Sequence, residues 1–180
     1  MQAIFRGVYS EPGVEEGLST ALRLALTSME NRVVVVCIGT DAYIPDALGP
    51  LVGTMLTEMG FSKPLYGTLD NPVHAKNLIM KLPAIRSSHP ECLQLAIDAS
   101  LGKKDEIGII EVRKGGVYPG KALQKRLPQV GQLSIIGKVG SLQGNTRLGN
   151  VPTGRLNLIY QMAQVLAKGL IIWEREQSFR

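Results

Sequence analysis

The segment from residue 33 to residue 50 constrains the fold of this 180-residue chain more than any other. The run Val33 to Ile38 is apolar and rich in β-branched residues, which is typical of a strand buried on both faces. An acidic loop that contains Asp46 follows it, and the pair Gly49-Pro50 then suits the start of a helix. In parallel α/β proteins, ligands and chemistry gather at the carboxyl ends of strands. The segment therefore places Asp46 where a reaction can occur.

A second apolar run ends in the same way. Leu93 to Ile97 is predicted to be a strand, and Asp98 follows it directly. Because neighbouring parallel strands share one carboxyl edge, we expect Asp46 and Asp98 to lie side by side at that edge. Their carboxyl groups are expected within roughly 10 Å of each other, close enough to hold one water molecule between them.

Strands and helices alternate along the rest of the chain. Further strands are predicted near residues 65–69, 106–112 and 133–139. Helices are predicted over residues 15–29, 49–59, 71–82, 122–127 and 155–168. Residues 83–90 and 140–153 are predicted to be loops. This alternation predicts a largely parallel sheet flanked by helices, in a single domain that spans residues 1–180.

Composition narrows the functional classes. Hydrophobic residues make up 44% and charged residues 19%, as in an ordinary globular protein. The net charge of +5 permits nucleic-acid binding, but the basic residues are scattered and aromatic residues reach only 5%, so we expect no nucleic-acid partner. No apolar run is long enough for a membrane span and no signal peptide is recognisable, so we expect a cytoplasmic protein. Cys37 and Cys92 are expected to be reduced residues of the core.

Several spaced motifs resemble the YyaC family of sporulation proteins, which are inferred to be spore proteases. The first is the segment from Cys37 to Leu56 described above. The others are Tyr66–Leu78, Ala96–Gly102, Pro119-Gly120, Leu127–Gly131 and Asn145–Leu148. The segments around Asp46 and Asp98 also resemble the two acidic motifs of the germination protease, which degrades small acid-soluble spore proteins. The strand, glycine loop and acid further resemble the nickel-hydrogenase maturation endopeptidases.

The resemblance implies a three-layer α/β/α sandwich with a central, mostly parallel mixed sheet. It implies hydrolysis of peptide bonds, with the two active-site aspartates of the germination protease falling on Asp46 and Asp98. It also implies a protein or peptide substrate, including small acid-soluble spore proteins, in the cytoplasm of a sporulating bacterial cell.

One feature of the hydrogenase endopeptidases is missing from this chain. Those proteins place a histidine some thirty residues beyond the second acid, as a third metal ligand. Here the only two histidines are His74 and His89, and both precede Asp98. The chain also has no Cys-x-x-Cys pair. We therefore expect no tightly held metal and no cofactor.

Two carboxylates can hydrolyse an amide without a metal if one is ionised and the other is protonated. Asp46 precedes a helix N-terminus, whose dipole favours an anion, so it is assigned as the base. Asp98 ends a buried strand, where desolvation favours the protonated form, so it is assigned as the acid. The structural alternatives are a helix cap for Asp46 and a strand-end turn residue for Asp98.

Four further residues are candidates for substrate binding. Asp41 lies in the acidic loop and is otherwise a turn residue. His74 lies in a family motif and is otherwise a core histidine. Asn145 and Arg147 lie in the glycine-flanked loop 140–153, where Arg147 can clamp a carboxylate or form a surface salt bridge.

Three functions remain open at the level of sequence. The first is a metal-independent endopeptidase that acts through Asp46 and Asp98. The second is a non-catalytic protein that binds a peptide or protein partner. The third is a metal-dependent processing endopeptidase in which Asp46, Asp98 and His74 hold a divalent ion.

Overall fold

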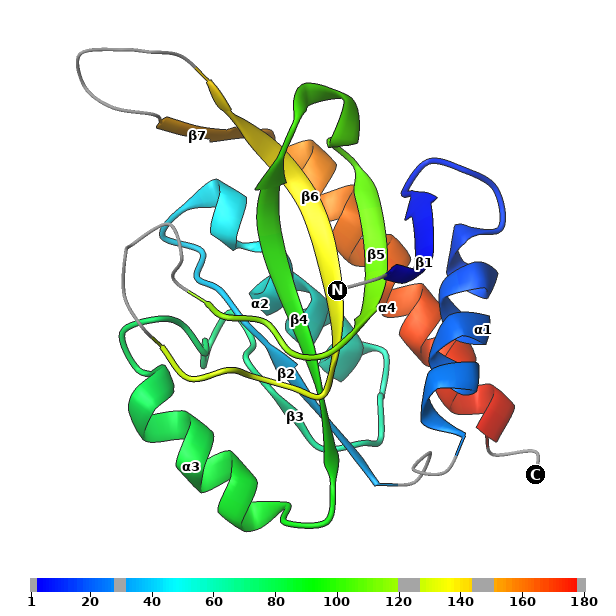
Figure 1. Cartoon of the computed structure of the whole chain (residues 1–180), viewed down its shortest axis with the longest axis vertical. Coiled ribbons are helices and arrows are strands. Elements are labelled where there is room, and N and C mark those ends of the chain that lie inside the picture. The colour runs from blue at the N-terminus through cyan, green and yellow to red at the C-terminus, as the bar shows by residue number, and fades with distance from the viewer. Residues whose placement is uncertain (1–2, 28–31, 120–126, 144–150, 178–180) are drawn as a thin grey trace.

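The computed structural model describes residues 3–27, 32–119, 127–143 and 151–177 (Figure 1). Seven strands lie within these residues: Ala3–Val8 (β1), Val33–Cys37 (β2), Leu65–Tyr66 (β3), Leu93–Gly102 (β4), Ile109–Lys114 (β5), Leu133–Gln143 (β6) and Val151–Gly154 (β7). The helices are Val14–Leu26 (α1), Leu48–Glu58 (α2), Leu78–Ser88 (α3) and Leu156–Gln177 (α4). Two short 3₁₀ turns, Ile44–Asp46 (η1) and Lys104–Glu106 (η2), complete the described elements.

The strands form one mixed sheet in the order β1-β5-β6-β4-β2-β3, and β7 pairs with the far end of β6. Strand β4 lies between β2 and β6 and runs parallel to both, and β2 is also parallel to β3. The pairs β1–β5, β5–β6 and β6–β7 are antiparallel. The four parallel strands therefore share one carboxyl edge, as the sequence predicted.

Successive residues of β2 face opposite sides of the sheet and enter two separate cores. Val33, Val35 and Cys37 pack with residues of α1, α2 and α4. Val34 and Val36 pack instead with residues of α3. All five residues of β2 are buried, which explains their unbroken apolar character. The predicted three-layer α/β/α fold with a mixed sheet is thereby confirmed, and Figure 1 shows α4 running beside α1.

Strand β4 is longer than the predicted strand Leu93–Ile97, because it continues to Gly102. Residues Asp98 to Gly102 keep their pairing with β6, whereas β2 already ends at Cys37. Asp98 therefore lies within β4 and not at its end. It still stands at the carboxyl edge of β2, one position beyond the last β2–β4 pair.

Two helix predictions are wrong because a proline or glycine that was expected to lie outside the helix lies inside it. Pro83 lies inside α3, so the predicted loop 83–90 is mostly helical. The helix also starts later than predicted, at Leu78 instead of Asn71. Pro83 is exposed, so water can solvate the backbone carbonyl that its missing N–H leaves without a donor. Gly169 lies inside α4, where a Cβ would stand 2.7 Å from Leu18 Cδ2 of α1. It permits the close approach of α1 and α4 and does not stop the helix.

Three smaller predictions also need correction. The loop 140–153 is in part the hairpin of β6 and β7. Strand β1, an edge strand in which buried and exposed residues partly alternate, was missed. The strand predicted over 106–112 runs instead from Ile109 to Lys114. The predicted helix 122–127 lies almost entirely outside the described residues.

Candidate functional site: an aspartate pair at the carboxyl edge

The loop after β2 is tied to the next parallel segment by backbone hydrogen bonds. Gly39 N–H donates to the carbonyl of Val73 at 2.8 Å, and Ile38 forms a parallel bridge with Val73. Thr40 N–H then donates to the backbone carbonyl of Asp46 at 3.0 Å. These bonds close the loop at both ends, so Asp46 is held beside the end of β2.

Two glycines make this closure possible. Gly39 has φ +139°, and a Cβ on it would stand 2.0 Å from the carbonyl oxygen of Asp46. A Cβ on Gly49, in the first turn of α2, would stand 2.1 Å from the carbonyl oxygen of Ile38. The helix starts at Leu48 with Ala47 as its cap, so Gly49 serves close packing and not capping. The spacing of glycines around Asp46 thus reflects the contact between α2 and the end of β2.

Asp98, in β4, also lies at the carboxyl edge of β2. Ile38 N–H donates to the carbonyl of Ile97 at 2.7 Å, which aligns the end of β2 with the residue before Asp98. Ala96 faces the α3 side of the sheet, so Asp98, two residues further along the strand, faces that side as well. Ala99 N–H donates to Asp98 Oδ1 at 2.9 Å and fixes the carboxyl group locally.

The pKa values of both aspartates are raised, and the charge of Asp46 acts on Asp98. Burial raises the pKa of Asp46 to about 6, against the opposing effect of the Thr40 backbone N–H. Burial also raises the pKa of Asp98 well above its usual range, the negative charge of Asp46 raises it further, and the Ala99 N–H opposes both. The contact between turn η1, which contains Asp46, and strand β4, which contains Asp98, is consistent with this electrostatic effect.

The order of the two ionisations follows from the same effects. Asp46 loses its proton at about pH 6, whereas Asp98 then has to ionise beside an existing negative charge. Asp98 therefore keeps its proton to a higher pH than Asp46 does. A pair in which one carboxyl group ionises before the other suits a general base and a general acid.

The other predicted site residues are not all at the pair. Asp41 is exposed in the same loop. His74 follows Val73, but its ring is turned toward its own turn, where Nδ1 accepts the Lys76 N–H at 3.2 Å. Asn145 and Arg147 lie outside the described residues. The substrate-binding roles of these four residues stay predictions.

Sequence reasoning missed Asn77, which organises the turn that holds Gly39. Its Oδ1 accepts the His74 N–H at 2.9 Å, and its Nδ2 donates to the carbonyl of Pro72 at 3.0 Å. Between these two contacts lies Val73, whose carbonyl accepts the Gly39 N–H. The only sequence signal for this role is an asparagine just before a helix, which is also common in ordinary turns.

A metal centre of three protein ligands has no counterpart in the described part of the chain. No group of three or more histidine, cysteine, aspartate or glutamate side chains there lies close enough to hold an ion. His74, proposed as a third ligand in one of the three hypotheses, is engaged with Lys76 instead. The residues around Asp46 and Asp98 therefore do not fit the histidine-containing metal site of that hypothesis.

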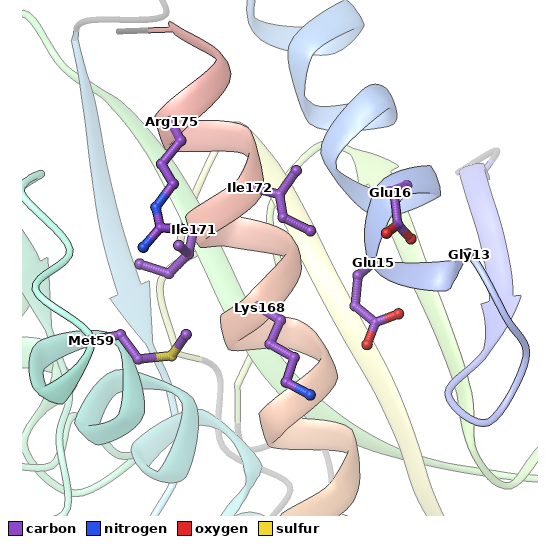
Figure 2. A pocket seen from close by; sticks show the side chains of 8 residues that line it. All are labelled: Gly13, Glu15, Glu16, Met59, Lys168, Ile171, Ile172 and Arg175. Carbon is purple, nitrogen blue, oxygen red and sulfur yellow. The ribbon is translucent and has the colours of Figure 1, made fainter.

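A separate groove of about 330 Å³ lies between α1, α4 and the end of α2 (Figure 2). Glu15 and Glu16 from α1, Lys168 and Arg175 from α4, and Met59 are among the side chains that line it. Helix α2 has 11 residues and so spans about 16 Å, with Asp46 before its start and Met59 after its end. The groove is thus distinct from the aspartate pair.

No helix in the described residues is long and apolar enough to cross a membrane.

Comparison with known proteins agrees with the fold and with the sequence motifs. The chain is 41% identical to the Bacillus subtilis (strain 168) protein "Uncharacterized protein YyaC" over 161 residues, which cover 89% of this chain and 77% of that protein. Its fold is similar to that of the [NiFe] hydrogenase maturation protease HycI from Thermococcus kodakarensis KOD1, with a TM-score of 0.57 and 18% sequence identity. That similarity covers 86% of this chain and 98% of HycI.

The resemblance to YyaC and to a hydrogenase-maturation fold, inferred from the motifs around Asp46 and Asp98, is confirmed by these comparisons. The resemblance of the two acidic motifs to those of the germination protease stays a prediction. A family model described as "Protein of unknown function (DUF1256)" matches residues 7–169. The chain belongs to the DUF1256 family.

Proposed function

We propose that this protein is an endopeptidase that hydrolyses peptide bonds with Asp46 and Asp98, in the cytoplasm of a sporulating cell. The observation that carries the proposal is the coupled pair of carboxyl groups with raised pKa values at the carboxyl edge of the parallel strands. The protease-like fold shared with HycI supports it, although at 18% identity the likeness extends to the fold alone.

The reaction assigns one role to each aspartate. Ionised Asp46 takes a proton from a water molecule, and the oxygen of that water attacks the carbonyl carbon of the scissile bond. Protonated Asp98 gives its proton to the leaving nitrogen as the carbon–nitrogen bond breaks. The products are a carboxylic acid and an amine. Transfer of the proton from Asp46 back to Asp98 restores the starting state.

The assignment of base and acid rests on the order of ionisation. Asp46, whose pKa is about 6, is ionised near neutral pH. Asp98 is the more strongly shifted group because burial and the charge of Asp46 act in the same direction. A carboxyl group that stays protonated near neutral pH can act as a general acid there.

The test is incubation of the purified protein with small acid-soluble spore proteins and, separately, with an unfolded model protein such as β-casein. New peptide termini are identified by mass spectrometry. We expect cleavage by the wild type and none above background by Asp46→Asn. If the folded wild type cleaves neither substrate between pH 5 and 8, the alternative of a non-catalytic peptide-binding protein takes precedence.

A further inference from the structure

The loop that carries Asp46 exposes two large apolar side chains. The Tyr43 side chain has 72% and Ile44 45% of its surface accessible to solvent. Single exposed apolar residues are common on protein surfaces, but these two are adjacent and directly precede the aspartate turn. Their exposure therefore asks for an explanation in terms of what contacts this loop.

Hydrogen bonds hold the backbone of the loop that carries these side chains. Asp46 N–H donates to the Tyr43 carbonyl at 2.8 Å, and Ala47 N–H donates to the Ile44 carbonyl at 3.1 Å. Ala42 N–H donates to Thr40 Oγ1 at 3.2 Å. A loop bonded in this way cannot easily fold its apolar side chains into the core, so they stay available at the surface.

The start of α4 lies near this loop, because turn η1 contacts both α4 and β7. Helix α4 carries two further exposed apolar residues, Leu156 at 56% and Tyr160 at 46%, and residues four positions apart lie on the same face of a helix. We call the adjacent pair Tyr43 and Ile44 the apolar rim.

We infer that the apolar rim, through Tyr43 and Ile44, selects polypeptide substrates with an apolar side chain next to the scissile bond. This inference rests on the proposed hydrolysis by Asp46 and Asp98. A 3₁₀ turn rises about 2 Å per residue, so Tyr43 and Ile44 lie only about 4–6 Å along the chain from Asp46. An extended substrate advances about 3.3–3.6 Å per residue. A bond placed at Asp46 thus has its flanking residues within reach of Tyr43 and Ile44.

The chemistry of that contact determines the preferred residue. An apolar substrate side chain gains free energy when it covers Tyr43 and Ile44, whereas a charged one must shed water there. The exposed carboxylate of Asp41, in the same loop, further disfavours an acidic residue. The expected substrate is therefore an extended or unfolded polypeptide cleaved beside leucine, valine, phenylalanine or similar residues.

The experiment compares matched peptides and matched variants. A peptide is taken from a bond that the wild type cleaves, and copies carry leucine, serine or glutamate at each of the three positions on either side. We expect the wild type to prefer leucine over glutamate at one or more of these positions by about 10-fold or more in kcat/KM. The double variant Tyr43→Ser/Ile44→Ser should lose most of this preference, mainly through KM.

Leu24→Ser provides the matched control. Leu24 is 71% exposed but lies near the end of α1, and its replacement should leave the preference unchanged. A wild type that cleaves peptides with no apolar preference, or a double variant that keeps the full preference, overturns the inference and leaves the proposed function standing. A wild type that cleaves no peptide at all overturns the proposed function, and the inference with it.

Discussion

The negative charge of Asp46 raises the pKa of Asp98, although the two residues belong to different segments of the chain. The β2 end and its closed loop present Asp46, and the part of β4 that runs past β2 presents Asp98. A coupled pair of this kind makes a direct prediction about titration. Replacing Asp46 by Asn removes the neighbouring charge, so the pKa of Asp98 should fall but stay above its usual range because burial remains.

That prediction is checked by nuclear magnetic resonance of ¹³C-labelled aspartate carboxyl groups in the wild type and in Asp46→Asn. The resonance of Asp46 should titrate near pH 6 in the wild type. The coupling is refuted if the titration of Asp98 is the same in both proteins.

The raised pKa values also predict how stability depends on pH. The folded state binds a proton at Asp46 more tightly than the unfolded chain does, with a pKa of about 6 against 3.8. Protonation therefore favours folding, and this contribution is fully present below pH 3.8 and is lost as the pH rises through 6. The raised pKa of Asp98 likewise makes protonation favour folding, and this contribution is lost over a pH range that extends higher.

Asp98→Asn removes this unfavourable ionisation and should stabilise the protein at pH 8. The gain should appear as a higher Tm at pH 8, because the Asn side chain carries no charge that burial disfavours. The advantage over the wild type should shrink toward pH 4, because the carboxyl group of the unfolded chain, with its ordinary pKa of 3.8, then also binds a proton for much of the time. Thermal unfolding at pH 4, 6 and 8 measures it, and an Asp98→Asn protein that is less stable than wild type at pH 8 contradicts the account.

Gly49→Ala should disrupt the site through packing. Its Cβ would stand 2.1 Å from the Ile38 carbonyl oxygen, and backbone cannot move aside cheaply. We expect a loss of about 3 kcal/mol or more in the free energy of unfolding, measured in urea. Gly60→Ala is the control, because nothing lies within 4 Å of its Cβ and only its φ of +76° is unfavourable. A Gly49→Ala protein no less stable than Gly60→Ala would show that the close contact is not required.

Asn77→Ala should loosen the turn that holds Gly39. The substitution leaves the part-buried His74 N–H without its side-chain acceptor, at about 1 kcal/mol, whereas the Pro72 carbonyl keeps its hydrogen bond from Lys81 Nζ at 3.1 Å. Asn71→Ala is the control in the same loop, since Asn71 is exposed and bonds to the Lys81 amine. We expect Asn77→Ala to lower both stability and peptide cleavage, and Asn71→Ala to change stability by less than about 0.5 kcal/mol. If the two substitutions lower stability and peptide cleavage equally, Asn77 does not organise the turn as described.

The sequence predicted the layers and the central strands because their signals are local. The unbroken apolar run Val33–Cys37 marks a strand covered on both faces, and the structure confirms it. The glycines and aspartates of the loop could be recognised from their motif. The parallel pairing of β2 and β4, expected from their similar endings, is also present.

The predictions that fail do so because the feature depends on contacts with distant parts of the chain. The length of β4 depends on pairing with β6 beyond residue 98, which the sequence of β4 does not reveal. Gly169 resembles a helix end, and only the proximity of Leu18 on α1 shows its packing role. The role of Asn77 depends on a hydrogen bond between Val73 and Gly39, 34 positions apart in the chain.

The most direct measurement of the central claim is the rate of peptide cleavage by Asp46→Asn, Asp98→Asn and the double variant beside the wild type. Each single substitution keeps the shape of the side chain but removes a proton-transfer partner, so we predict a loss of about 10²- to 10⁴-fold in kcat. Because the pair acts as a unit, the double variant should be little slower than the slower single variant. If the folded single variants cleave at the wild-type rate, Asp46 and Asp98 are not the hydrolytic pair.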